Sequence, residues 1–315
     1  MKAAMDAAYK NISRRTLMID ASMPAPRRFP LLLVGSFLAL YFVWGSTYFF
    51  IQMGVQSWPP MLMAGVRFVL AGSLLFGFLR WRGAPNPTPK QWLAGGAIGM
   101  LLLSCGNGGV TVAEHAGVPS GVAALAIATV PLFTVLFSRL KGHRSTRLEW
   151  AGIGLGLLGI FLLNMGESLQ ASPMGAALIL FAAASWAFGS VWSRSLPLPE
   201  GAMASAVEMI IGGLVLLAGS ALSGESLQQW PTTRGWFALL YLVLFGSILA
   251  FSAYMYLLKH VRPAAATSYA YVNPVVAVLL GISFADEQIG VWECMAMLVI
   301  ICAVVLIGLP QWRKA

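Results

Sequence analysis

Ten apolar runs, each of about 20 residues, constrain this chain more than any other feature of its sequence. A helix of that length spans about 30 Å, which is the thickness of the hydrocarbon core of a bilayer. Proline and glycine residues separate the runs, and the gaps are too short to hold a soluble domain. The sequence therefore predicts an all-α polytopic membrane protein with spans over 30–51, 60–80, 92–113, 119–140, 148–164, 174–194, 203–222, 235–257, 263–283 and 291–309.

The composition excludes a soluble protein. Only 10% of the 315 residues are charged and 58% are hydrophobic, whereas soluble domains carry about 25% charged residues. The three cysteines lie in apolar runs without the spacing of metal ligands, so we expect no metal, cofactor or disulfide framework. The segment 154–159 reads G-x-G-x-x-G, but it lies inside a predicted span and indicates helix packing instead of a nucleotide site.

The basic residues are divided unequally between the two sides of the predicted bundle. Of the 20 Lys and Arg residues, 18 fall in segments on the side of the N-terminus, one (Arg234) falls on the opposite side, and Arg67 lies within a span. An excess of Lys and Arg marks the cytoplasmic side. We therefore expect both termini to be cytoplasmic, with 1–29 as a polar tail, unless the chain starts at Met23, and 310–315 as the C-terminus.

Similarities between the two halves indicate an internal repeat. Gly45-Ser46 recurs as Gly189-Ser190, and Gly65-Val66-Arg67 aligns with Ala206-Val207-Glu208. Prolines also recur at matching places in the fourth and ninth spans. Because the repeat unit has five helices, an odd number, the second copy must enter from the opposite face. The predicted fold is ten transmembrane helices in two inverted five-helix repeats, an architecture of secondary transporters with a substrate site near the midplane.

The pattern resembles the EamA-type exporters of the drug/metabolite transporter superfamily over residues 30–310. The shared motifs are Trp44-Gly45-Ser46-Thr47, Arg67-Phe68, Pro131, Asn273-Pro274 and Glu287. The resemblance implies two EamA-type repeats, 30–164 and 174–309. It also implies a carrier in the bacterial inner (plasma) membrane that exports metabolites, often amino acids or drug-like solutes. The last span departs from the family pattern, because it has Glu293-Cys294 and Cys302-Ala303 where the family tends to have glycines.

Two charged residues are predicted deep within spans. Arg67 lies about 10 Å below the outer edge of its span, where a charge costs about 2.5–3.5 kcal/mol unless it faces the protein interior. Its guanidinium could hold a substrate carboxylate; snorkelling or a structural role is the alternative. Glu208, its counterpart in the repeat, suits proton coupling or a gating hydrogen bond. About 12 Å along the membrane normal separates the two, so we expect no permanent ion pair.

Aromatic and polar residues complete the candidate site. Tryptophan and tyrosine belts form at the ends of spans, whereas the selected aromatics lie well inside them, and core packing is the alternative reading. Asn107 begins a polar stripe with Thr111, which could also join helices. The predicted substrate-binding residues are Trp44, Ser46, Arg67, Asn107, Trp186, Glu208, Tyr254, Tyr269 and Asn273, with Pro131 and Pro274 as hinge or gating positions.

The predicted function is secondary-active export of small metabolites by alternating access. Amino acids or related amphipathic solutes are preferred because Arg67 offers a carboxylate partner beside aromatic walls. Efflux of cationic drugs, a channel and a membrane-embedded enzyme remain alternatives, although no nucleophile–base constellation supports enzyme activity. The expected partners are a small-molecule substrate and the lipid bilayer, with a homodimer left open and no nucleic acid.

Overall fold

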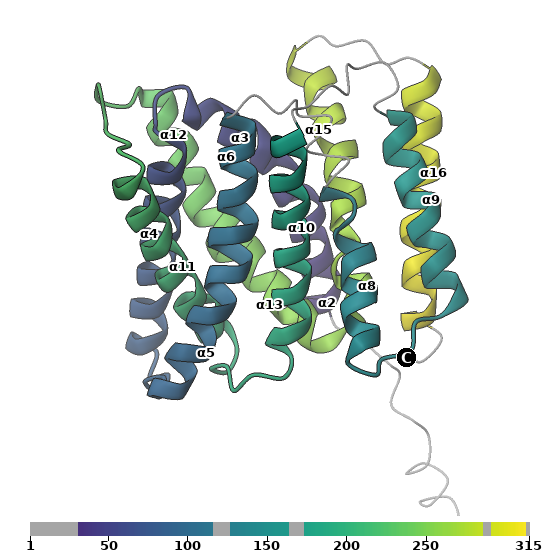
Figure 1. Ribbon diagram of the computed structural model, residues 1–315, viewed down its shortest axis with the longest axis horizontal. Coiled ribbons are helices and arrows are strands. Elements are labelled where there is room, and N and C mark those ends of the chain that lie inside the picture. The colour runs from purple at the N-terminus through teal and green to yellow at the C-terminus, as the bar shows by residue number, and fades with distance from the viewer. Residues whose placement is uncertain (1–30, 116–126, 164–172, 286–290, 313–315) are drawn as a thin grey trace, which may run out of the picture.

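The computed structural model describes residues 31–115, 127–163, 173–285 and 291–312, and every regular element in these ranges is a helix (Figure 1). The predicted polar tail 1–29, the start of the fourth predicted span and Glu287 lie outside the described residues.

The helices join into long rods that lie side by side (Figure 1). Several rods are composite. The first comprises α2 (Leu31–Leu38), η1 (Ala39–Trp44) and α3 (Gly45–Val55); α4 (Pro60–Trp81) follows; the next comprises α5 (Pro89–Gly99), η2 (Met100–Gly108) and α6 (Gly109–His115). Then come α8 (Val130–Leu140), α9 (Arg147–Leu163), α10 (Pro173–Ser193) and α11 (Ala202–Leu222). The last rods are α12 (Thr233–Tyr241) with η3 (Leu242–Leu249) and α13 (Ala250–His260), α14 (Pro263–Ala266) leading into α15 (Tyr269–Ala285), and α16 (Val291–Trp312).

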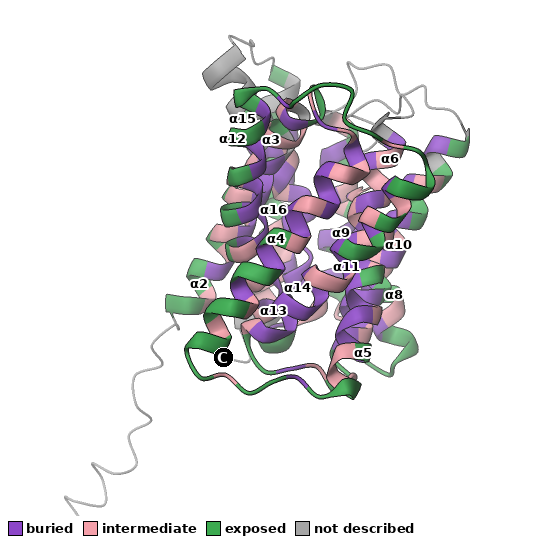
Figure 2. Ribbon diagram, turned by 90° about the vertical axis from the view of Figure 1, so that its left-hand side faces the viewer, coloured by how far each residue is buried: buried purple, intermediate pink, exposed green. Residues whose placement is uncertain are grey.

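The described helices have the length and the surface of a membrane protein. Five are long and apolar enough to cross a bilayer: Leu31–Val55, Pro60–Trp81, Pro89–Ala113, Ala202–Leu222 and Thr233–His260. Figure 2 shows buried residues on the inward faces of the helices and exposed ones outside. Large apolar side chains such as Leu74, Leu214 and Leu298 are exposed, which is unfavourable in water but suits contact with lipid tails.

Three of the rods contain a π-helical stretch: η1, η2 and η3. A π-helical turn bonds residue i to i+5, is wider than an α turn and occurs frequently at functional sites. Hydrophobic patterning does not reveal such stretches, so they are not predicted from the sequence. The stretches contain Trp44, Asn107 and Gly246, respectively.

Glycines bring α4 and α11 into backbone contact. A Cβ atom at Gly72 would lie 2.8 Å from the carbonyl oxygen of Ala206, and one at Gly213 would lie 3.0 Å from that of Gly65. Such close approach requires glycine, and it gives tight van der Waals packing where lipid offers no hydrophobic drive for association. The two contacts are reciprocal in the repeat that the sequence predicts, because that repeat aligns Gly65 and Gly72 with Ala206 and Gly213.

The helices α9 and α16 form a second such pair, set to one side of the bundle (Figure 1). A Cβ atom at Gly152 would lie 2.9 Å from the carbonyl oxygen of Ala303, and one at Gly159 would lie 3.3 Å from that of Ala296. This pair therefore also makes two contacts of the same kind, one toward each end of α9.

Polar contacts gather the most basic segments at one end of the bundle, hereafter the basic end (residues 139–149, 194–199 and 259–262). Arg194 donates to the carbonyl of Val261 at 3.2 Å, and Arg262 forms an ion pair with Glu149 at 2.5 Å. The hydrogen bond with Glu149 raises the pKa of Arg262 above its ordinary value. At the opposite end, Glu225 accepts hydrogen bonds from the first backbone amides of α4, including that of Leu62 at 2.8 Å.

The packing of α5 on α11 predicts a contrast between two glycines. Gly99→Ala should destabilise the protein by about 1–3 kcal/mol, because the added Cβ would collide with the backbone carbonyl of Glu208, which cannot turn away. The matched control is Gly77→Ala on α4, where nothing lies within 4 Å of the added Cβ atom. The thermal unfolding midpoint of this control in detergent should be unchanged or raised. Equal midpoints for the two variants would contradict this packing.

Candidate functional site

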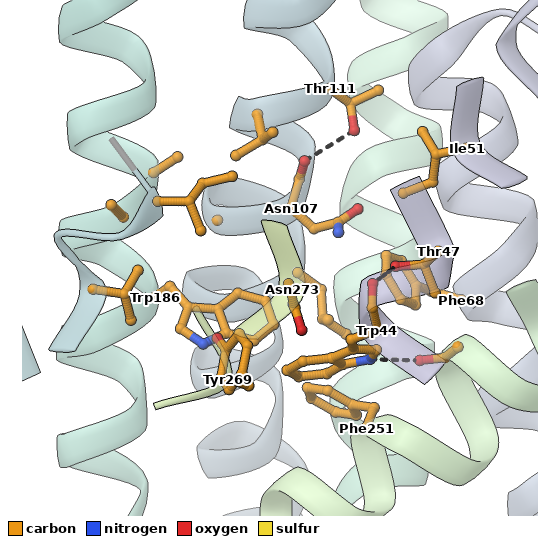
Figure 3. Close-up of a pocket in the computed structure, with 18 of the residues that line it drawn as sticks. Trp44, Thr47, Ile51, Phe68, Asn107, Thr111, Trp186, Phe251, Tyr269 and Asn273 are labelled. Atoms are coloured by element: carbon orange, nitrogen blue, oxygen red, sulfur yellow. Dashed lines mark hydrogen bonds between the residues drawn. The ribbon is translucent and has the colours of Figure 1, made fainter. Parts of the chain in front are cut away.

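A cavity of about 110 Å³ lies among the rods, and the three π-helical stretches meet at it. Trp44 of η1, Asn107 of η2 and Gly246 of η3 all line the cavity, with further walls from α4, α8, α10 and α15. Figure 3 shows an apolar and aromatic surround with a few polar groups. This is the composition of small-molecule sites in general, where few polar groups orient a ligand held by apolar walls.

Aromatic rings packed around Trp44 close one side of the cavity (Figure 3). The ring centre of Trp44 lies 4.7 Å from that of Tyr269, 5.2 Å from that of Tyr254 and 5.6 Å from that of Trp186. The edge-to-face geometry with Tyr269 and Trp186 is favourable for aromatic pairs. Rings from four rods thereby form one cluster, hereafter the aromatic floor (Trp44, Trp186, Tyr254 and Tyr269).

Hydrogen bonds hold the aromatic floor in place. The indole Nε1 of Trp44 donates to the carbonyl of Gly246 at 2.9 Å, so the π-helical stretch η3 supplies its acceptor. The hydroxyl of Tyr254 lies 2.6 Å from Ser190 Oγ and accepts from Trp186 Nε1 at 3.1 Å. Because a buried tryptophan or tyrosine needs a polar partner, these bonds explain how the rings lie inside an apolar bundle.

Arg67 places a guanidinium group at the cavity. Its side chain is only 4% exposed and lines the cavity. Nε donates to Ser247 Oγ at 2.8 Å, and the guanidinium lies over the ring of Phe68 at 4.7 Å from its centre. Within the described ranges no carboxylate forms an ion pair with it. The serine orients the charge without neutralising it, which leaves a positive group for an anionic ligand.

Two asparagines bring amide groups to the same cavity. Asn107 and Asn273 both line it, from η2 and α15 (Figure 3). Asn273 is 2% exposed and its side-chain oxygen has no hydrogen-bond partner among the described residues. A buried acceptor without a partner is costly, so a ligand that donates a hydrogen bond there would gain affinity.

The structure brings six of the nine predicted binding residues to the cavity wall: Trp44, Arg67, Asn107, Trp186, Tyr269 and Asn273. Tyr254 lies one layer further, supporting Trp44 and Trp186. Ser46 points elsewhere, bonding the carbonyl of Val43 and the hydroxyl of Tyr241, each at 2.7 Å.

The remaining predicted positions lie outside the wall. Glu208 is 0% exposed, does not line the cavity, and neither carboxylate oxygen has a hydrogen-bond partner in the described structure. Pro131 and Pro274 each directly follow a lining residue, Val130 and Asn273.

Sequence reasoning missed the contribution of η3. Gly246 and Ser247 hold Trp44 and Arg67, respectively, from more than 170 residues away along the chain. A glycine and a serine inside an apolar run are ordinary in a membrane helix. Their adjacency in the eighth predicted span is the one feature of the sequence that could have marked them as site residues.

Comparison with known proteins identifies a family that covers most of the chain. The EamA-like transporter family matches residues 31–165 and 173–309. The Escherichia coli inner membrane transporter YedA is 54% identical over 280 residues, covering 89% of this chain and 92% of YedA. A probable amino-acid metabolite efflux pump of Escherichia coli is 24% identical over 88% of this chain and 95% of its own length. A solved crystal structure shares the fold, with a TM-score of 0.74 at 21% identity over 89% of this chain.

An apolar helical bundle with a central, sparsely polar cavity is the form of a membrane transporter. The chain belongs to the EamA-like transporter family.

The aromatic floor predicts a measurable role for one hydroxyl. Tyr254→Phe should lower the stability by about 1–3 kcal/mol, because it removes the acceptor of Trp186 Nε1 and a partner of Ser190. Tyr256→Phe is the matched control, since that side chain is half-buried and stacks on His260 through its ring. Thermal unfolding should separate the two variants; similar midpoints would show that the hydroxyl network contributes little.

Proposed function

We propose that the chain exports amino acids, or closely related zwitterionic solutes, by secondary-active alternating access across the bacterial inner membrane. The observation that carries this proposal is Arg67, a buried cation without a carboxylate partner in the described ranges that lines the cavity. An exported solute with a carboxylate group would complete the missing pair.

The other cavity groups suit the rest of an amino acid. A guanidinium holds a carboxylate through two parallel hydrogen bonds. The side-chain oxygen of Asn273 accepts a hydrogen bond, which an ammonium group can donate. An ammonium is also attracted to the faces of aromatic rings, and the aromatic floor provides a surface for an apolar side chain.

Efflux of cationic drugs is less well supported by this cavity. A cation entering beside Arg67 would meet like charge in a site of low polarity, which is unfavourable. The probable amino-acid metabolite efflux pump among the relatives also supports the amino-acid proposal.

We also propose the finer architecture: ten spans in two inverted repeats, 30–164 and 174–309. The reciprocal glycine contacts between α4 and α11 support it, because a twofold relation between the halves would produce such a pair. The occurrence of η2 and η3 in the third and eighth predicted spans is a second supporting observation. With the basic end on the cytoplasmic side, both termini would be cytoplasmic, and Pro131 and Pro274 would be paired hinge positions.

Counterflow in liposomes tests the proposed substrate. Liposomes that contain the protein and are preloaded with unlabelled amino acids should take up labelled amino acids faster than protein-containing liposomes that are not preloaded. Arg67→Gln should reduce this exchange at least about 30-fold, because losing a desolvated charge pair costs about 2 kcal/mol or more. Asn273→Ala should weaken apparent affinity for amino acids more than for the corresponding carboxylic acids that lack the amine.

Ser46→Ala is the control, since that serine belongs to the sequence motif but bonds away from the cavity. It should keep near-normal exchange. Folded Arg67→Gln protein that still exchanges amino acids at the unmodified rate would refute the carboxylate role, and exchange of cationic dyes alone would assign the carrier to drug efflux.

A further inference from the structure

A cleft opens at the basic end, separate from the cavity that Trp44 and Arg67 line. It has a volume of about 550 Å³ and lies where the ends of α8, α10 and α13 meet the starts of α9 and α14. Its polar lining includes Arg144, Arg194, Arg262, His143, His260 and Ser138. None of these residues lines that cavity.

The charges in this cleft are incompletely balanced. Glu149, which is 2% exposed, pairs with Arg262 and also accepts from the backbone amide of Thr146 at 2.6 Å. It is therefore fully engaged by its own surroundings. No carboxylate in the described ranges pairs with Arg144 or Arg194, so two guanidinium groups face the cleft with their charge uncompensated.

Ser138 supplies an independent indication of a ligand. Its side chain is 4% exposed, lines the cleft, and has an oxygen without a hydrogen-bond partner in the described structure. A hydroxyl group placed in this way is satisfied by a ligand that accepts a hydrogen bond. An oxygen-rich anion would meet the need of Ser138 and of the two arginines together.

We propose that this cleft binds a phosphate group. Guanidinium forks match the geometry of phosphate oxygens, and basic pockets between transmembrane helices on the cytoplasmic side characteristically hold lipid head groups. The cleft lies at helix ends, and under the proposed topology this end would face the cytoplasmic head groups. Val135, Val261 and Ala264 add an apolar wall that suits the glycerol and first methylenes of a lipid.

The same chemistry has two sources, an anionic phospholipid and free phosphate, and stability measurements distinguish them. Detergent-purified protein is titrated with phosphatidylglycerol, with phosphatidylcholine, and with inorganic phosphate against chloride at equal ionic strength. A ligand that binds only the folded state raises the unfolding midpoint. We expect phosphatidylglycerol to raise it by about 2–4 °C and phosphatidylcholine to raise it much less.

The decisive variant removes the two uncompensated charges, as Arg144→Gln/Arg194→Gln. Both residues are exposed, so the variant should fold. Its matched control, Arg82→Gln/Lys90→Gln, removes the same charge from exposed positions remote from the cleft. Stabilisation by the phosphate-bearing ligand should vanish in the first variant and persist in the second. Ser138→Ala should lower the apparent affinity for the phosphate-bearing ligand several-fold.

The outcomes separate cleanly. Stabilisation by phosphatidylglycerol alone assigns the site to lipid, and stabilisation by inorganic phosphate as well assigns it to a free phosphate group. No stabilisation by either, or an equal loss in the Arg82/Lys90 control, overturns the proposal. Because neither arm measures transport, the result is independent of whether the carrier moves amino acids.

Discussion

The burial of Arg67 is the constraint on which the centre of this structure depends. A guanidinium inside an apolar bundle is tolerated only if protein groups orient and solvate it, and here Ser247 and the ring of Phe68 do so. Ser247 belongs to η3, whose neighbouring carbonyl at Gly246 also anchors Trp44. One π-helical stretch therefore positions both the charge and the centre of the aromatic floor.

The close packing of α4 against α11 supports that arrangement. The glycines that allow the two backbones to touch lie on either side of Arg67 in α4, at Gly65 and Gly72. In lipid, helix association relies on such van der Waals contact and on internal hydrogen bonds. The helix that carries the cavity's charge is thus packed against α11 by backbone contact on both sides of Arg67 along the chain.

Much of the site was accessible from the sequence because membrane burial penalises polar groups so strongly. Arg67, Asn107 and Asn273 were selected as polar residues inside spans, and each lines the cavity. Depth within a span also predicted Glu208, which is buried but lies away from the wall. The motif at Trp44–Thr47 predicted Ser46, which bonds to Tyr241 instead. Depth in a span can be read from sequence, whereas the direction in which a side chain points depends on how neighbouring helices pack.

The sequence by itself determined that the chain is a helical membrane protein and which charges lie deep within it. Both follow from the length of apolar runs and from the cost of placing polar groups in hydrocarbon. Only the tertiary structure decided that η1, η2 and η3 meet at one cavity and that Gly246 and Ser247 hold its key residues. A π-helical turn and a contact across some two hundred residues both arise from packing between rods, which no periodicity within a single rod records.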